Sequence, residues 1–218
     1  MSEVVITVRG EHEVRIAPER AIVTLSVALD GPDREAVVAR TLALADPVRA
    51  SIVARAGSGA VETWSSRRLA VRSERPWSND GTRLALVHHA SVDFAATFTD
   101  FAEFSAWVAD VSAWEGVSVN STSWILTPET RARVEQEVAA EAVRTAVARA
   151  GAYATALGLA RVEPIEIADA GLITDRGAAD MTPKAMRAFA APPSGSGLEL
   201  QGDDLTVSAT VEARFVAD

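Results

Sequence analysis

Residues 4–27, VVITVRGEHEVRIAPERAIVTLSV, decide the fold of this chain. Aliphatic side chains stand at even positions on both sides of Gly10, namely at Val4, Ile6, Val8, Val14 and Ile16. Alternate side chains of a strand share a face, so the pattern predicts one long strand with a flexible centre at Gly10. Pro18-Glu19 predicts a turn, and the valine-rich run behind it predicts a second strand that completes an N-terminal hairpin.

Helices and strands alternate along the remaining chain, and their limits are indicated by capping and turn residues. We expect first a helix from Asp33 to about Ala56 that is kinked or restarted at Asp46-Pro47. Two strands over about 60–75 and 82–98, joined across Asp80-Gly81, should follow it. The remaining expected elements are a helix from Asp100 to Trp114, a strand over 117–126, a helix from Pro128 to Leu157, a short strand near 165–168 and a last strand over 205–215.

The order strand, helix, strand, strand, helix, strand between residues 21 and 126 is that of a split β-α-β unit. We therefore predict an α+β fold with a mostly antiparallel sheet and helices packed on one face. An N-terminal hairpin strand, a long third helix and a C-terminal strand are added to the split β-α-β core. In the long helix, helical spacing relates Val143, Val147, Ala150, Ala154 and Leu157, and the alanines around them are expected to let the helix lie close on a neighbour.

Several short motifs occur in an order that resembles the SIMPL-domain family, a bacterial family of unknown biochemical function. The motifs are Val8, Gly10, Val14, Pro18 and Ala21 in the opening stretch, then Val92-Asp93-Phe94, Leu157-Gly158-Leu159 and the strand ending at Phe215. His12 and Glu19 stand where the family pattern has glycine and aspartate, which indicates a distant branch. The resemblance implies one domain over residues 1–218. It also implies relatives that are periplasmic and immunogenic or linked to oxidative stress, at least one of which assembles into a ring-like or channel-like oligomer.

Composition excludes some classes of function. The 218 residues are 48% hydrophobic but contain no apolar run long enough to cross a bilayer. The net charge of -9 argues against a general nucleic-acid binder, because a phosphate backbone requires clustered positive charge. Met1-Ser2-Glu3 leads straight into the first strand without the basic start and apolar stretch of an export signal, so we expect a cytoplasmic protein.

Motifs that would indicate catalysis, a metal site or a cofactor are absent from the sequence. His88 and His89 are neighbours in a predicted strand and so point to opposite faces, which prevents them from binding one metal ion together. Gly57-Ser58-Gly59 follows a helix, so it is a helix stop and not a phosphate loop. We therefore expect no catalytic residue, no metal and no cofactor.

One group of residues is a candidate for binding a ligand or a partner. Trp64, Arg68 and Arg72 have the spacing of one face of a strand, with Arg75 at its end and Trp77 near the hairpin tip. Tryptophan and arginine together can bind an anionic or planar ligand, and both are enriched at the centres of subunit contacts. Alternatively, these are surface arginines whose aliphatic stems pack on the sheet.

Residues 171–197 show no periodic pattern of hydrophobic residues and contain Pro192-Pro193-Ser194-Gly195-Ser196-Gly197. We therefore predict a long loop that is a lid, an interface arm or a plain flexible segment.

Our first hypothesis for the whole chain is a non-enzymatic, self-associating protein with a role in the stress response. The rivals are a small-molecule or anion-binding protein or enzyme that uses this loop as a lid, and a scaffold that docks another protein or an unknown partner.

Overall fold

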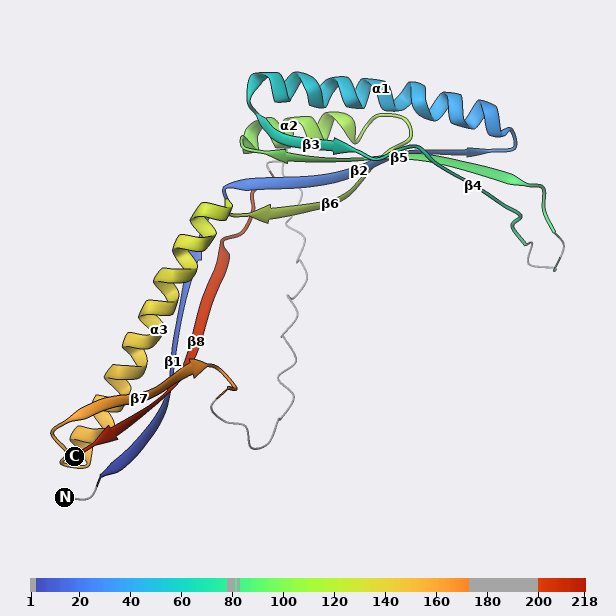
Figure 1. Ribbon diagram of the computed structural model, residues 1–218. Coiled ribbons are helices and arrows are strands. Elements are labelled where there is room, and N and C mark those ends of the chain that lie inside the picture. The colour runs from blue at the N-terminus through green and yellow to red at the C-terminus, as the bar shows by residue number, and fades with distance from the viewer. Residues whose placement is uncertain (1–2, 78–80, 82, 173–199) are drawn as a thin grey trace. The chain divides into compact units, whose positions relative to one another are not determined.

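The computed structural model describes residues 3–77, 81, 83–172 and 200–218, and their contacts form two compact units, drawn in Figure 1. Unit 1 comprises residues 3–16, 127–172 and 204–218, and unit 2 comprises residues 17–126 and 200–203. Each unit has its own sheet and its own hydrophobic core. Both sheets are antiparallel and carry helices, so the predicted α+β class is confirmed.

Unit 1 is a three-stranded sheet in the order β1-β8-β7, with one long helix along it (Figure 1). Its elements are β1 (Val4–Ile16), α3 (Pro128–Ala156), β7 (Val162–Asp169) and β8 (Leu205–Ala217). The predicted N-terminal hairpin is wrong, because β1 pairs with β8 over its whole length and belongs to a different sheet from the strand that follows it. Alternation along a strand identifies its buried face but does not identify its partner.

Gly10 in the middle of β1 is where α3 comes closest to the sheet. A Cβ atom added to Gly10 would lie 2.0 Å from the carbonyl oxygen of Ala142 and 2.7 Å from the backbone nitrogen of Ala146. The backbone of Gly10 stays regular and pairs with Val211, so this glycine is needed for close packing and not for flexibility.

The buried stripe of α3 contains two of the expected residues, Ala150 and Ala154, and Val143 packs beside it. It runs at every fourth residue through Val134, Val138, Ala142, Ala146, Ala150 and Ala154. Val147 and Leu157 lie outside it and are exposed, which corrects the predicted stripe. The reason is that the small alanines permit the short distance to β1, which the bulkier valine at position 147 would prevent.

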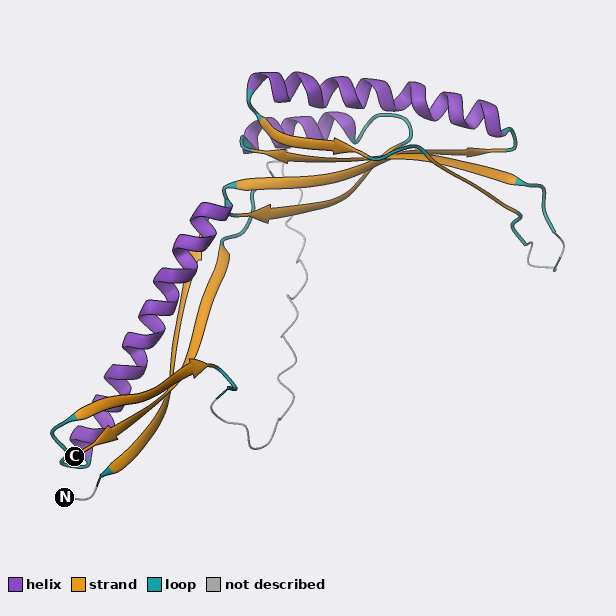
Figure 2. Ribbon diagram, viewed as in Figure 1, coloured by secondary structure: helices purple, strands orange, loops and turns teal. Residues whose placement is uncertain are grey.

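Unit 2 contains the predicted split β-α-β core. Its sheet has the order β3-β5-β2-β6, and β4 also pairs with β5. Helices α1 and α2 lie on the same face of this sheet, as Figure 2 shows, so the other face carries no helix from the described residues of unit 2. The elements are β2 (Arg20–Gly31), α1 (Arg34–Ser58), β3 (Val61–Ser66), β4 (Ala70–Glu74), β5 (Val87–Phe98), α2 (Phe101–Val111) and β6 (Val117–Ile125).

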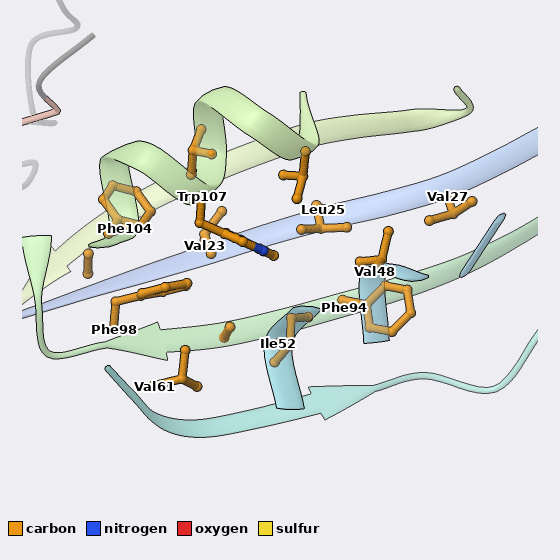
Figure 3. Packing of buried hydrophobic residues seen from close by; sticks show 14 of the residues in the cluster. Val23, Leu25, Val27, Val48, Ile52, Val61, Phe94, Phe98, Phe104 and Trp107 are labelled. Atoms are coloured by element: carbon orange, nitrogen blue, oxygen red, sulfur yellow. The ribbon is translucent and has the colours of Figure 1, made fainter. Parts of the chain in front are cut away.

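The core of unit 2 lies between the sheet and its two helices (Figure 3). Trp107 of α2 is fully buried, and its indole nitrogen donates a hydrogen bond to Ser51 Oγ on α1 at 3.0 Å. Phe98 contacts the rings of Trp107 and Phe104 at centroid distances of 5.2 and 5.4 Å. Phe94 is 2% exposed, as its position in the predicted strand required.

Local signals in the sequence set the helix ends of unit 2. The Asp33 side chain accepts hydrogen bonds from the backbone amides of Glu35 and Ala36, and Asp100 caps α2 in the same way. Gly59 ends α1 with a φ of 84°, and α1 continues through Pro47 without the expected restart. Helix α2 ends at Val111, three residues before the predicted end.

No helix in the described part of the chain is long and apolar enough to span a membrane. The predicted loop over 171–197 falls outside the described residues except for Gly171 and Leu172, so its assignment as a lid, arm or flexible segment stays a prediction.

Replacing Phe94 with alanine should lower the free energy of unfolding by about 3–5 kcal/mol, because the substitution leaves a cavity in a closed core. Chemical denaturation followed by tryptophan fluorescence measures this change. A loss below about 1 kcal/mol would contradict the burial of Phe94.

Replacing Gly10 with alanine should also destabilise the protein, by about 1–3 kcal/mol or more, because the new methyl group overlaps the backbone of α3. Gly151→Ala in the same helix is the matched control, since a Cβ added there meets no atom within 4 Å. The control should be neutral or stabilising by up to about 1 kcal/mol, as for other helical glycines. Equal thermal stabilities of the two variants would contradict the close contact.

Candidate functional site

The structure does not bring the predicted site residues together on one face. Trp64 of β3 stands opposite Ala96 and packs against the core, on the face that the helices cover. Arg72 of β4 stands opposite His89, on the uncovered face. The regular strand stops between Ser66 and Ala70, so the period that linked Trp64 to Arg72 is lost there.

Arg72 belongs to a small charged network on the uncovered face of the sheet. Its Nη1 donates to Glu74 Oε2 at 3.1 Å, and His89 Nε2 lies 3.2 Å from Glu74 Oε1. His88 points to the opposite face, where its Nδ1 lies 2.6 Å from Ser73 Oγ. The prediction that the two histidines face apart is therefore confirmed.

The other candidates are surface residues. Arg68 and Arg75 are exposed. Trp77 is 64% exposed, and the guanidinium carbon of Arg83 lies 5.1 Å from the centroid of its ring, a cation–π contact. The structure does not test whether any of the five candidates binds a ligand or a partner, so that role stays a prediction.

Two hollows lie along β5 on the uncovered face of the unit 2 sheet. The first, of about 340 Å³, is lined by Asp30, Arg72, His89 and Ser91 among others. The second, of about 270 Å³, we call the Asp93 hollow. It is lined by Thr24, Leu25, Ser65, Arg67, Asp93, Phe94, Ala95 and Asn120.

A β-bulge shapes the Asp93 hollow. Thr24 of β2 stands opposite Ser121, whereas Leu25 stands opposite Val119, so Asn120 is an extra residue in β6. The Asn120 Oδ1 atom accepts a hydrogen bond from Ser26 Oγ at 3.4 Å, which holds the amide on the uncovered face. A bulge of this kind commonly directs a side chain toward a functional site.

A second bulge, in β3, makes Glu62 an extra residue of that strand, and its side chain contacts Arg20 at the start of β2. Arg20 Nε and Nη2 donate to the Glu62 carboxylate at 3.0 and 3.3 Å. This hydrogen bonding and the positive charge hold the pKa of Glu62 below its usual range. The pair is exposed and contributes to neither hollow.

Unit 1 carries a different surface, which we call the α3–β7 groove. Helix α3 packs mainly on β1 and β8 and leaves β7 largely uncovered. The resulting apolar groove has a volume of about 430 Å³. It is lined by Val143, Ala146, Val147, Pro164, Ile165, Glu166, Ile167, Ala213 and Phe215.

Sequence reasoning missed both the Asp93 hollow and the α3–β7 groove. In the sequence, Asp93 is a polar position between Val92 and Phe94, and Arg67 is the neighbour of the candidate Arg68. A bulge such as that at Asn120 has no reliable sequence signal, because it depends on the register with the partner strand. Ile165 and Ile167 do alternate with Glu166, which is the one pattern that indicated an apolar face on β7.

The described residues contain no group of three or more histidine, cysteine, aspartate or glutamate side chains that could hold a metal ion. The arrangement of the uncovered face therefore offers hydrogen bonding and charge pairing as its chemistry. The α3–β7 groove offers apolar contact.

Comparison with known proteins gives one family match. The model of the SIMPL family, described as a protein of unknown function (DUF541), matches residues 6–215 and so takes in residues of both units. No curated protein matches the chain.

Proposed function

The chain belongs to the SIMPL family, whose description assigns no activity, and we propose that it works as a non-enzymatic homo-oligomer joined at the α3–β7 groove. The family resemblance supports this proposal, because it implies relatives that assemble and that are linked to stress. Protection under stress is accordingly the cellular role we propose for the assembled form.

The observation that carries the proposal is the exposure of aliphatic side chains around the groove. Ile165 and Ile167 are 56% and 54% exposed, and Val147 across the groove is 49% exposed. Removing apolar surface from water contributes about 25 cal/mol per Å². Contiguous apolar surface of this kind on a soluble protein commonly marks an interaction site.

The charge distribution favours a second copy of the chain as the occupant. Two copies that each carry a net charge of -9 repel each other over most of their surfaces. Among the described residues that line the groove only Glu166 is charged, and it accepts a hydrogen bond from Arg214 at 3.0 Å. The groove is therefore a place where two copies can approach with little repulsion.

The strand edges of unit 1 are poorly suited to self-association. Strand β8 is the central strand of its sheet, so it offers no edge. At the β1 edge, Arg149 Nη1 of α3 donates to the carbonyl oxygen of Arg9 at 2.6 Å, so part of that edge is already occupied. Pro164 lacks an amide donor, which weakens pairing along β7.

A stable interface must be larger than the groove itself. Specific contacts bury at least about 1,000 Å² in total. Tyr153 of α3 and Leu157, the residue that caps its C-terminus, are exposed, and the C-terminal half of α3 has few charges. We therefore propose that a symmetric contact between two copies includes the groove and this end of α3.

Val147→Glu should weaken the assembly about tenfold or more, because it places an unpaired charge in a desolvated contact. The matched control is Val53→Glu. Val53 lies on α1 in unit 2 and has the same exposed fraction, 49%. Sedimentation equilibrium of the three proteins measures the association constant.

The wild-type protein and the Val53→Glu control should show a mass above one chain, and the Val147→Glu protein should dissociate. A wild-type mass of one chain at micromolar concentrations would refute self-association. An oligomer that both variants leave unchanged would refute the groove as its contact.

A further inference from the structure

We propose that the Asp93 hollow binds a small zwitterion that carries a carboxylate next to an ammonium group, such as a free α-amino acid. The site lies in unit 2, and its residues take no part in the proposed contact at the α3–β7 groove. The proposal therefore stands independently of self-association.

Two opposite charges face each other across the hollow. Ser65 stands opposite Ala95 and Ser66 opposite Phe94, so the next position places Arg67 opposite Asp93. The amide of Arg67 donates to the carbonyl oxygen of Asp93 at 2.8 Å, which fixes the two backbones side by side. Residues opposite each other in an antiparallel pair point to the same face, and both residues line the hollow.

Neither side chain is neutralised in the described part of the chain. No ion pair joins Arg67 to Asp93, and neither side chain has another hydrogen-bond or ion-pair partner among the described residues. Asp93 is half-buried, so its carboxylate is less well solvated than a fully exposed one. A ligand that brings an ammonium to Asp93 and a carboxylate to Arg67 compensates both charges at once.

Asn120 and Ser65 supply further donors on the carboxylate side of this ligand. The Asn120 Oδ1 atom already accepts from Ser26, so the Nδ2 amide of Asn120 is the part that can donate to a ligand. Ser65 also lines the hollow and has a hydroxyl that can donate. Thr24 is already engaged, because its Oγ1 lies 2.7 Å from Ser121 Oγ.

The size and charge of the hollow restrict the ligand. A volume of about 270 Å³ suits a molecule with few heavy atoms. A phosphate-rich ligand is disfavoured, because Asp93 would repel it and Arg67 is the one cation among the lining residues that the structure describes. A purely cationic ligand is disfavoured by Arg67 for the same reason.

The neighbouring hollow is also lined by an arginine and an aspartate, Arg72 and Asp30, but its arginine is already hydrogen-bonded. There the arginine, Arg72, already donates to Glu74, so a ligand carboxylate would have to replace this hydrogen bond. In the Asp93 hollow, a ligand can reach Arg67 and Asp93 without replacing an existing contact between described side chains.

Titration of the full-length protein with glycine and with L-serine, followed by backbone amide chemical shifts, tests the proposal. We expect saturable shifts at Arg67, Asp93 and Asn120. Asp93→Asn and Arg67→Gln should each weaken binding about tenfold or more, since each removes a charge-assisted hydrogen bond. The matched control is Arg68→Gln, because Arg68 is an exposed arginine like its neighbour Arg67 but does not line the hollow.

Acetate and methylammonium, each carrying one of the two charges, should bind more weakly than glycine. Acetate binding as tightly as glycine would show a simple anion site and overturn the zwitterion assignment. Absence of saturable shifts with both amino acids, or equal loss of affinity in the Arg68→Gln control, would overturn the site itself.

Discussion

The contact between Gly10 of β1 and Ala142 and Ala146 of α3 determines how unit 1 is built. A glycine on the strand and alanines on the helix let the two backbones approach more closely than larger side chains would allow. Because this contact centres the helix on β1 and β8, the third strand, β7, is left largely uncovered. The exposed isoleucines of β7 and the α3–β7 groove are thus a consequence of where α3 is held.

Unit 2 follows a different constraint. A split β-α-β order returns both helices to one face of the sheet, so the opposite face has to be compatible with water. Along β5, Asp93 stands between the smaller residues Ser91 and Ala95 on that face; Ser91 lines the first hollow, and Asp93 and Ala95 line the second. The small side chains of Ser91 and Ala95 leave room for the hollows, and charged side chains such as Asp93 can form hydrogen bonds and ion pairs there.

The sequence predicted the elements well and their neighbours less well. Strand periodicity and helix caps such as Asp33 and Asp100 act locally, so the elements and most of their ends could be inferred from adjacent residues. The pairing of β1 with β8 could not, because the partners come from opposite ends of the chain and β2 offers an equally apolar pattern. The face shared by Trp64 and Arg72 was lost for a similar reason, since an irregular segment between β3 and β4 resets the alternation.

The candidate sites were harder to predict than the fold, and the cause is physical. Asn120 reaches the Asp93 hollow through a bulge, and Arg67 does so through its register with β5, so both depend on pairing between strands that are distant in sequence. The apolar groove depends on the phase of α3, which is set by steric contact at Gly10 more than by hydrophobicity.

The proposed association uses a surface with little charge, whereas the proposed ligand binding uses uncompensated charge, so one patch could not serve both. In this chain the two kinds of surface lie in different units, and each can therefore be altered without removing the other.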